Sequence, residues 1–116
     1  MDHGQTLGLV GESGCGKSVT AMSIIRLLPS PPSRVESGQV IFDGQDLLKL
    51  DDAAMRNIRG NRIGMIFQEP MTSLNPTFSI GFQIGEVLRL HRGLGQRQVR
   101  DRCIELLDMV GVGSPA

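Results

Sequence analysis

Short apolar runs dominate the first part of the chain. Thr6–Val10 and Ile63–Phe67 are rich in apolar residues, and runs of this length predict strands that are buried on both faces, as in a parallel sheet. A third short strand is predicted at 39–42, where the turn signal Asp43-Gly44 ends it. The pattern therefore favours a sheet that is covered on both sides.

Two helices are predicted between these strands. The segment 17–28 contains neither Gly nor Pro and carries apolar residues along its length, until Pro29 stops it. The segment 51–58 favours a second helix, for which Asp51 or Asp52 is the expected N-cap. Strands and helices thus alternate in this part of the chain.

The period of the apolar residues becomes helical near the end of the chain. In 80–88 they share one face of a helix, and from Val99 to Val110 they recur at i, i+4, i+7, i+8 and i+11, before Gly111 acts as a stop. A loop bounded by prolines comes before this part. We therefore expect the chain to divide at about residue 78 into an α/β part and a small helical part.

Composition narrows the classes of function. The formal net charge is zero, which gives no electrostatic footprint for nucleic acid or for an anionic membrane. No apolar run approaches the ~20 residues that a membrane-spanning helix needs. Cys15 and Cys103 have no metal-ligand or disulfide spacing, which favours a reduced, cytosolic compartment.

The chemistry of the chain is concentrated at residues 11–18. Their sequence, GESGCGKS, fits the phosphate-loop pattern G-x-x-x-x-G-K-[ST] at every fixed position. Glycines let consecutive N–H groups point at a polyphosphate, and the helix that starts there turns its positive end toward the same place. Lys17 adds a charge for the β- and γ-phosphates, and Ser18 offers a hydroxyl to Mg²⁺. The predicted nucleotide-binding residues are Gly11, Glu12, Ser13, Gly14, Cys15, Gly16, Lys17, Ser18 and Val19.

Cys15 and Val19 are predicted to contribute through the backbone and not through their side chains. Cys15 is expected to use its backbone N–H, and its side chain is then a small spacer and not a reactive thiol. Val19 stands where many relatives have Thr, but its backbone N–H can still serve the α-phosphate. The departure at Val19 therefore predicts no loss of binding.

Three stretches taken together resemble the ATP-binding subunit of ABC transporters. They are residues 11–18, the segment SGQVIFDG at 37–44 and the segment IFQEP at 66–70. The next residues, MTSLNP at 71–76, are similar to the branch that imports oligopeptides, dipeptides and nickel. The resemblance covers essentially the whole chain.

The resemblance implies a fold and roles for particular residues. It implies an α/β P-loop ATPase core with an incomplete sheet over 1–78, followed over 79–116 by the start of an all-α helical subdomain. Gln68 occupies the position of the Q-loop glutamine, which is implied to contact Mg²⁺ and the attacking water and to hinge the core to the helical part. Lys17 and Gln68 are the catalytic candidates, and Ser18 and Gln68 are the metal candidates. Taken alone, Gln68 has the plainer interpretation of an exposed loop glutamine.

The resemblance also implies an activity and partners. The full-length subunit is expected to bind ATP with Mg²⁺ and to hydrolyse it, driving uptake of peptides or related small solutes. The implied partners are a second ABC ATPase subunit, transmembrane permease subunits and, indirectly, an extracytoplasmic solute-binding protein. This places the subunit at the cytoplasmic face of the cell membrane as a peripheral protein, with no nucleic-acid partner.

Other elements of the family do not occur in the sequence. There is no Leu-Ser-Gly-Gly-Gln signature, no apolar strand ending in Asp-Glu and no aromatic residue before Phe42. We therefore expect a segment of a longer subunit, cut at both ends, whose unpaired strands make it marginally stable or prone to associate. A truncated module that binds ATP without hydrolysing it remains an alternative. A GTPase is disfavoured because no Asn-Lys-x-Asp motif is present, and a small-molecule kinase because no acceptor site or lid is recognisable.

Overall fold

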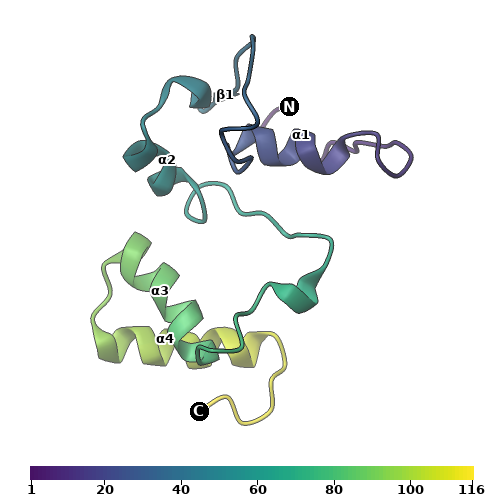
Figure 1. Cartoon of the computed structure of the whole chain (residues 1–116). Coiled ribbons are helices and arrows are strands. Elements are labelled where there is room, and N and C mark those ends of the chain that lie inside the picture. Colours follow the sequence, from purple (N-terminus) through teal and green to yellow (C-terminus); the bar gives the residue numbers. More distant parts are fainter. The chain divides into compact units, whose positions relative to one another are not determined.

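The computed structural model describes all 116 residues. The chain forms two compact units, Met1–Arg59 and Gly60–Ala116, and Figure 1 traces their elements in chain order. The first unit contains α1 (Lys17–Ile24), β1 (Ile41–Phe42), β2 (Gln45–Asp46), the 3-10 turn η1 (Leu47–Lys49) and α2 (Asp52–Ile58). The second contains the 3-10 turn η2 (Pro70–Thr72), α3 (Ile80–Arg92) and α4 (Gln96–Met109).

The only sheet of the structure is a two-stranded antiparallel hairpin. Ile41 pairs with Asp46 and Phe42 pairs with Gln45. Asp43 and Gly44 both have positive φ, 49° and 78°, which is the geometry of a type I′ turn. The strand predicted at 39–42 is therefore present in a shorter form, and its turn is where the sequence indicated.

The strands predicted at 6–10 and 63–67 are wrong for this structure. Neither segment belongs to a strand. Most of their side chains are exposed, with Leu7 at 75%, Val10 at 92% and Ile66 at 96%, while Ile63 and Met65 are half-buried. A strand needs a neighbour that offers N–H and C=O groups in register, and apart from an isolated bridge at Arg59 and Ile63 neither run pairs with another segment. The observed architecture is thus helices with one small antiparallel hairpin, and the predicted parallel sheet is absent from it.

The first unit is held together by a small apolar cluster and by arginine side chains. Leu47 and Met55 are fully buried, and Ile25 and Ile58 are nearly so. The helix predicted at 51–58 is confirmed as α2, and its N-cap is Asp51, whose carboxylate accepts from the N–H of Ala54 at 2.7 Å. This unit carries the glycine loop.

Helix α1 ends four residues earlier than the sequence predicted. Its last residue is Ile24, and Arg26 adopts a positive φ of 54°. The N–H groups of Arg26 and Leu27 donate to the carbonyls of Ser23 and Met22 at 3.1 and 2.9 Å, which is a Schellman ending with Arg26 where glycine is usual. Pro29 therefore follows a helix that has already stopped.

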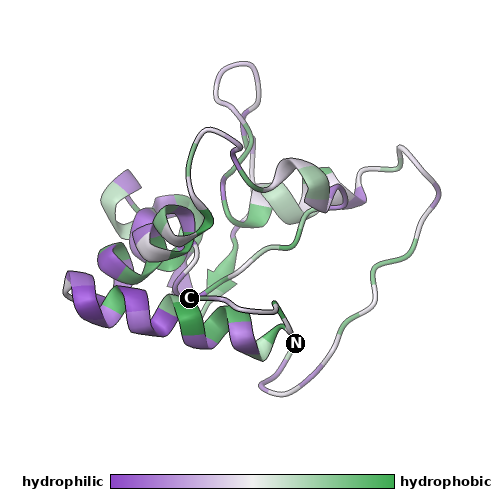
Figure 2. Ribbon diagram, turned by 90° about the horizontal axis from the view of Figure 1, so that it is seen from below, coloured by the Kyte–Doolittle hydropathy of each residue, from purple (hydrophilic) through white to green (hydrophobic).

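The second unit is built on helices α3 and α4, which pack against each other. Ser79 caps α3, with its Oγ accepting from the N–H of Phe82 at 3.2 Å. Helix α4 ends in a Schellman motif at Gly111, whose φ is 81°, as its predicted role as a stop requires. Figure 2 shows polar and apolar residues alternating along the α4 ribbon, and Val99 and Cys103 are its buried residues. The helical period predicted after residue 79 is confirmed.

A glycine sets how closely the two helices approach. A Cβ added to Gly85 of α3 would lie 2.7 Å from Cγ1 of Val99 on α4, so a larger residue does not fit without movement. The predicted subdomain boundary at about residue 78 stays a prediction, since the compact units divide after Arg59. No helix of the structure has the combination of length and apolar character that crossing a membrane demands.

Candidate functional site

The glycine loop leads directly into the first turn of α1. Gly16 is the N-cap of the helix and has a φ of 96°, and Gly14 has a φ of 80°. These left-handed conformations are readily available only to glycine. Gly11 meets a different demand, because a Cβ added there would lie 2.4 Å from the Sγ of Cys15. The sequence pattern of this loop is therefore explained by its backbone geometry.

The ammonium group of Lys17 lies over the loop. Its Nζ donates to the carbonyl of Gly11 at 2.6 Å and to that of Glu12 at 2.8 Å, and it lies 3.6 Å from the Sγ of Cys15. An ammonium group has three donors, so each of them has a partner inside the loop. The charge is thus held beside the same backbone that carries the glycines.

The loop presents backbone donors that the chain does not use. The N–H groups of Gly14 and Gly16, and those of the first three residues of α1, donate to no carbonyl. Donors at a helix N-terminus together with a glycine turn form a concave site for an anion. The N–H of Cys15 differs, because it donates to the carbonyl of Glu12 at 3.2 Å. The anion-binding role predicted for Cys15 remains a prediction.

Some hydroxyl groups at the start of α1 form hydrogen bonds within the chain, and one does not. Thr20 and Ser23 donate to the carbonyls of Gly16 and Val19 at 2.8 and 2.7 Å. Ser18 is exposed and its hydroxyl makes no hydrogen bond within the chain. A free hydroxyl next to the lysine fits a group that coordinates the metal of a metal–nucleotide complex.

Gln68 belongs to the other compact unit. It is an exposed residue in the loop before η2, and its side chain makes no hydrogen bond within the chain. No group of three or more His, Cys, Asp or Glu side chains comes together in a way that could hold a metal ion. The catalytic and metal-binding roles of Gln68 therefore stay predictions that the resemblance carries.

Two arginines that the sequence pattern did not single out stabilise the helix behind the loop. Arg59 donates to the carbonyls of Ile25 and Arg26 at 2.7 and 2.6 Å. Arg26 in turn donates to the carbonyls of Leu47 and Leu50 and pairs with Asp52 at 3.7 Å. A positively charged side chain next to the end of a predicted helix is the signal that could have pointed to them, because carbonyls at that end need donors.

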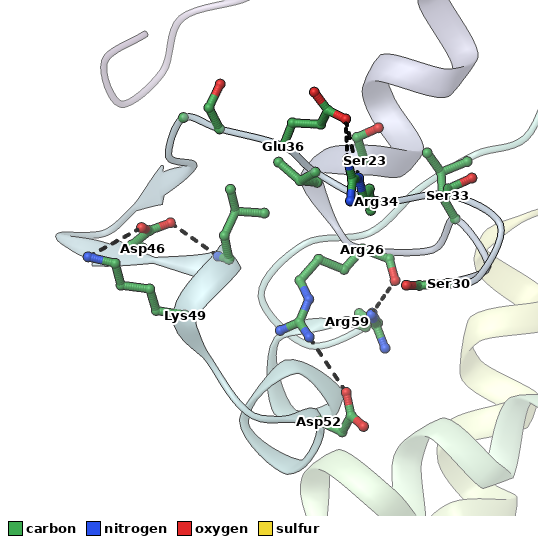
Figure 3. A pocket seen from close by; sticks show the side chains of 15 residues that line it. Ser23, Arg26, Ser30, Ser33, Arg34, Glu36, Asp46, Lys49, Asp52 and Arg59 are labelled. Atoms are coloured by element: carbon green, nitrogen blue, oxygen red, sulfur yellow. Dashed lines mark hydrogen bonds and ion pairs between the residues drawn. The ribbon is translucent and has the colours of Figure 1, made fainter.

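These arginines line a cavity of 730 Å³ in the first unit. Figure 3 shows Arg26, Arg59 and Asp52 on one side of it, with the pairs Arg34–Glu36 and Lys49–Asp46 on the others. The two outer pairs have distances of 2.8 and 4.0 Å. Each of these charged side chains already has a partner within the chain.

Open backbone donors, a lysine and a free hydroxyl at the start of a helix define a P-loop nucleotide-binding protein. A family model described as ABC transporter matches residues 1–114. The chain therefore belongs to the ABC transporter family.

Similar proteins come from several bacteria. The oligopeptide transport ATP-binding protein OppD of Bacillus subtilis is 50% identical over 115 residues, which are 99% of this chain and 32% of OppD. A putative peptide import ATP-binding protein of Brucella abortus is 54% identical over 117 residues, covering 97% of this chain and 35% of that protein. The uncharacterized ABC transporter ATP-binding protein YejF of Escherichia coli is 53% identical over 116 residues, covering the whole chain and 22% of YejF. The chain thus spans about a third or less of the length of these relatives.

Proposed function

We propose that this chain is the phosphate-binding part of the ATP-binding subunit of an ABC importer. In this proposal the whole subunit hydrolyses ATP and drives the uptake of peptides or related small solutes. The observation that carries it is the set of unused N–H groups at Gly14, Gly16 and the start of α1, beside the ammonium group of Lys17. The peptide substrate is supported by the names of the relatives, an oligopeptide transport protein and a putative peptide import protein.

Each part of the loop has a distinct task in the proposal. The open N–H groups hold phosphate oxygens, and Lys17 supplies the positive charge for the β- and γ-phosphates. The Ser18 hydroxyl makes no hydrogen bond within the chain and is the group that would hold Mg²⁺. When bound, this ion would neutralise phosphate charge. Gln68 orients the attacking water, a task suited to an amide because it both donates and accepts without titrating.

The proposed partners follow from the family. A second ATPase subunit, two transmembrane permease subunits and an extracytoplasmic solute-binding protein complete the importer. The subunit then works at the cytoplasmic face of the membrane, attached to the permeases and not inserted in the bilayer.

A second candidate is a module that binds ATP but does not hydrolyse it alone. It is favoured by the same loop, because holding phosphate needs only donors and charge, which residues 11–19 supply within one short segment. Hydrolysis needs positioned water in addition. The two candidates share the binding step and differ in turnover.

Binding and turnover are tested on the full-length subunit with Lys17→Ala. Losing this charge-assisted donor should weaken binding of a non-hydrolysable ATP analogue with Mg²⁺ by about 10- to 150-fold in calorimetry, the equivalent of ~1.5–3 kcal/mol. Lys49→Ala is the matched control, because Lys49 is an exposed lysine of the same unit that pairs only with Asp46. It should bind as the wild type does.

The outcomes separate the candidates. ATP turnover by the wild-type subunit with its partners, lost in Lys17→Ala, supports the importer. Binding that depends on Lys17 without any turnover supports the binding module. Equal affinity of the wild type and Lys17→Ala would show that the loop is not the site.

A further inference from the structure

A glutamine in the first turns of α3 holds the segment that follows the Gln68 loop. The Oε1 of Gln83 accepts from the N–H of Asn75 at 2.8 Å. Its Nε2 donates to the carbonyl of Asn75 at 2.9 Å and to that of Phe78 at 3.0 Å. One side-chain amide thus binds both backbone groups of a residue that lies eight positions before it.

The segment bound by Gln83 is also fastened internally. The Oδ1 of Asn75 accepts from the N–H and the Oγ1 of Thr77 at 3.0 and 2.6 Å, and the N–H of Phe78 donates to the carbonyl of Asn75 at 3.2 Å. The rings of Phe78 and Phe82 stack with their centroids 5.0 Å apart. Residues 75–78 are therefore attached to α3 by polar and aromatic contacts together.

The residues before this segment lack such an attachment. Within 68–74 the hydrogen bonds are local, from Ser73 to Pro70 and from Thr72 to Glu69. No hydrogen bond joins 68–74 to α3. Gln68 and Met71 are exposed. Hydrogen bonds to α3 therefore begin at Asn75, although Ser73 and Leu74 already line a pocket together with Gln83.

We propose that Gln83 is a positioning residue that makes 75–78 move as one body with α3. Any displacement of α3 is then transmitted to the short stretch 68–74, at whose start Gln68 lies. The role in ATP hydrolysis rests on the proposed function. The attachment itself rests only on the contacts of Gln83, Asn75 and Phe78.

The chemistry at this position is specific to an amide. A carboxylate accepts but cannot donate to the two carbonyls, and an aliphatic side chain does neither. Gln83→Glu would bring a negative charge against the carbonyl oxygens of Asn75 and Phe78. Gln83→Met keeps the length of the side chain and removes all three bonds.

The first measurement follows hydrogen exchange in the full-length subunit assembled with its permease partners. The peptide covering 74–79 is read by mass spectrometry, because it contains the protected N–H groups of Asn75, Thr77 and Phe78. In Gln83→Met its protection should fall by about tenfold, the equivalent of ~1.4 kcal/mol, because the hydrogen bonds of the Gln83 amide are lost. Gln98→Met is the matched control: Gln98 accepts one bond, from the N–H of Gly95 at 3.1 Å, and its loss should leave this peptide unchanged.

The second measurement separates kcat from KM for ATP in the same complex. A positioning role predicts a lower kcat in Gln83→Met and Gln83→Glu, with the affinity for a non-hydrolysable ATP analogue unchanged. The Gln98→Met control should keep the wild-type kcat. A merely structural role would lower the amount of folded complex and leave kcat per folded complex as it is.

The other possible results each test one part of the proposal. Unchanged protection of 74–79 in Gln83→Met would overturn the attachment. Lost protection with an unchanged kcat would overturn the positioning role. A wild-type complex that binds but does not turn over ATP would overturn the importer proposal and, with it, the role of Gln83 in turnover, while the exchange result still decides the attachment.

Discussion

The glycine loop and the α3–α4 pair are held in shape by different means. The loop depends on bonds between near neighbours, such as those from Lys17 to the carbonyls of Gly11 and Glu12, and on left-handed glycines. The helix pair depends on the fit of Val99 against Gly85 across two elements. A short segment can form its backbone geometry by itself, whereas packing requires a second element. The loop and the helix pair should therefore respond to different substitutions.

The largest expected effect concerns the association state of the 116-residue chain. Apolar side chains at 7–10 and 66–67 are exposed, and contiguous exposed apolar surface favours self-association. We expect sedimentation to show oligomers and hydrogen exchange to show fast amides at 6–10 beside slower ones in α3 and α4. A monomer that unfolds in a single cooperative transition would contradict this and would remove the contrast between the two regions.

Gly85→Ala should break the helix pair while sparing the loop. The added methyl group meets Cγ1 of Val99 at 2.7 Å, and overpacking of this kind costs about 1–3 kcal/mol. Exchange of amides in α3 and α4 is the measurement.

Gly81→Ala gives the matched control for that substitution. It lies on the same helix, and a Cβ there meets nothing within 4 Å, so better helix propensity should stabilise α3 by up to ~1 kcal/mol. Equal effects of the two substitutions would show that the distance at Val99 does not limit the packing.

Arg59→Met tests the first unit in the same way. It removes the donors to the carbonyls of Ile25 and Arg26 and should destabilise the end of α1 by about 1–3 kcal/mol, seen as faster exchange in 20–27. Arg34→Met is the control, because its pair with Glu36 is exposed and such pairs contribute about 0–1 kcal/mol. Similar losses from both would mean that the carbonyl contacts of Arg59 do not stabilise α1.

The smallest effects are expected at the helix caps. Asp51→Ala and Ser79→Ala each remove one bond at an N-cap, worth about 1 kcal/mol. Exchange should rise in α2 for the first and in α3 for the second, with no effect on the other unit. Faster exchange in helices other than the one that was changed would contradict a local role of these caps.

The parts of the structure that a local pattern determines could be predicted from the sequence. The glycine loop, the Asp51 cap and the Gly111 stop each depend on residues within a few positions, and each is present. The family assignment is confirmed as well. In each of these local patterns, the residues themselves determine the backbone conformation.

The features that were missed depend on distant residues. An apolar run such as 6–10 signals a buried environment, and without a paired segment it stays exposed. At the early end of α1 the carbonyl of Arg26 accepts from Arg59, which lies 33 positions further along the chain. The sequence pattern did not single out Gly85, whose close approach to Val99 depends on a residue of another helix. The periodicity of apolar residues does not show which distant segment a given residue will contact.

The position of Lys17 has a consequence for the heat of nucleotide binding. Since the ammonium group is already bound to the carbonyls of Gly11 and Glu12, a phosphate enters by exchange of partners and not by addition to a bare charge. The enthalpy measured for the ligand is then the difference between two sets of charge-assisted bonds. Removing the lysine alters both sides of this exchange, because the empty loop loses its internal cross-link at the same time as the ligand loses its counter-charge.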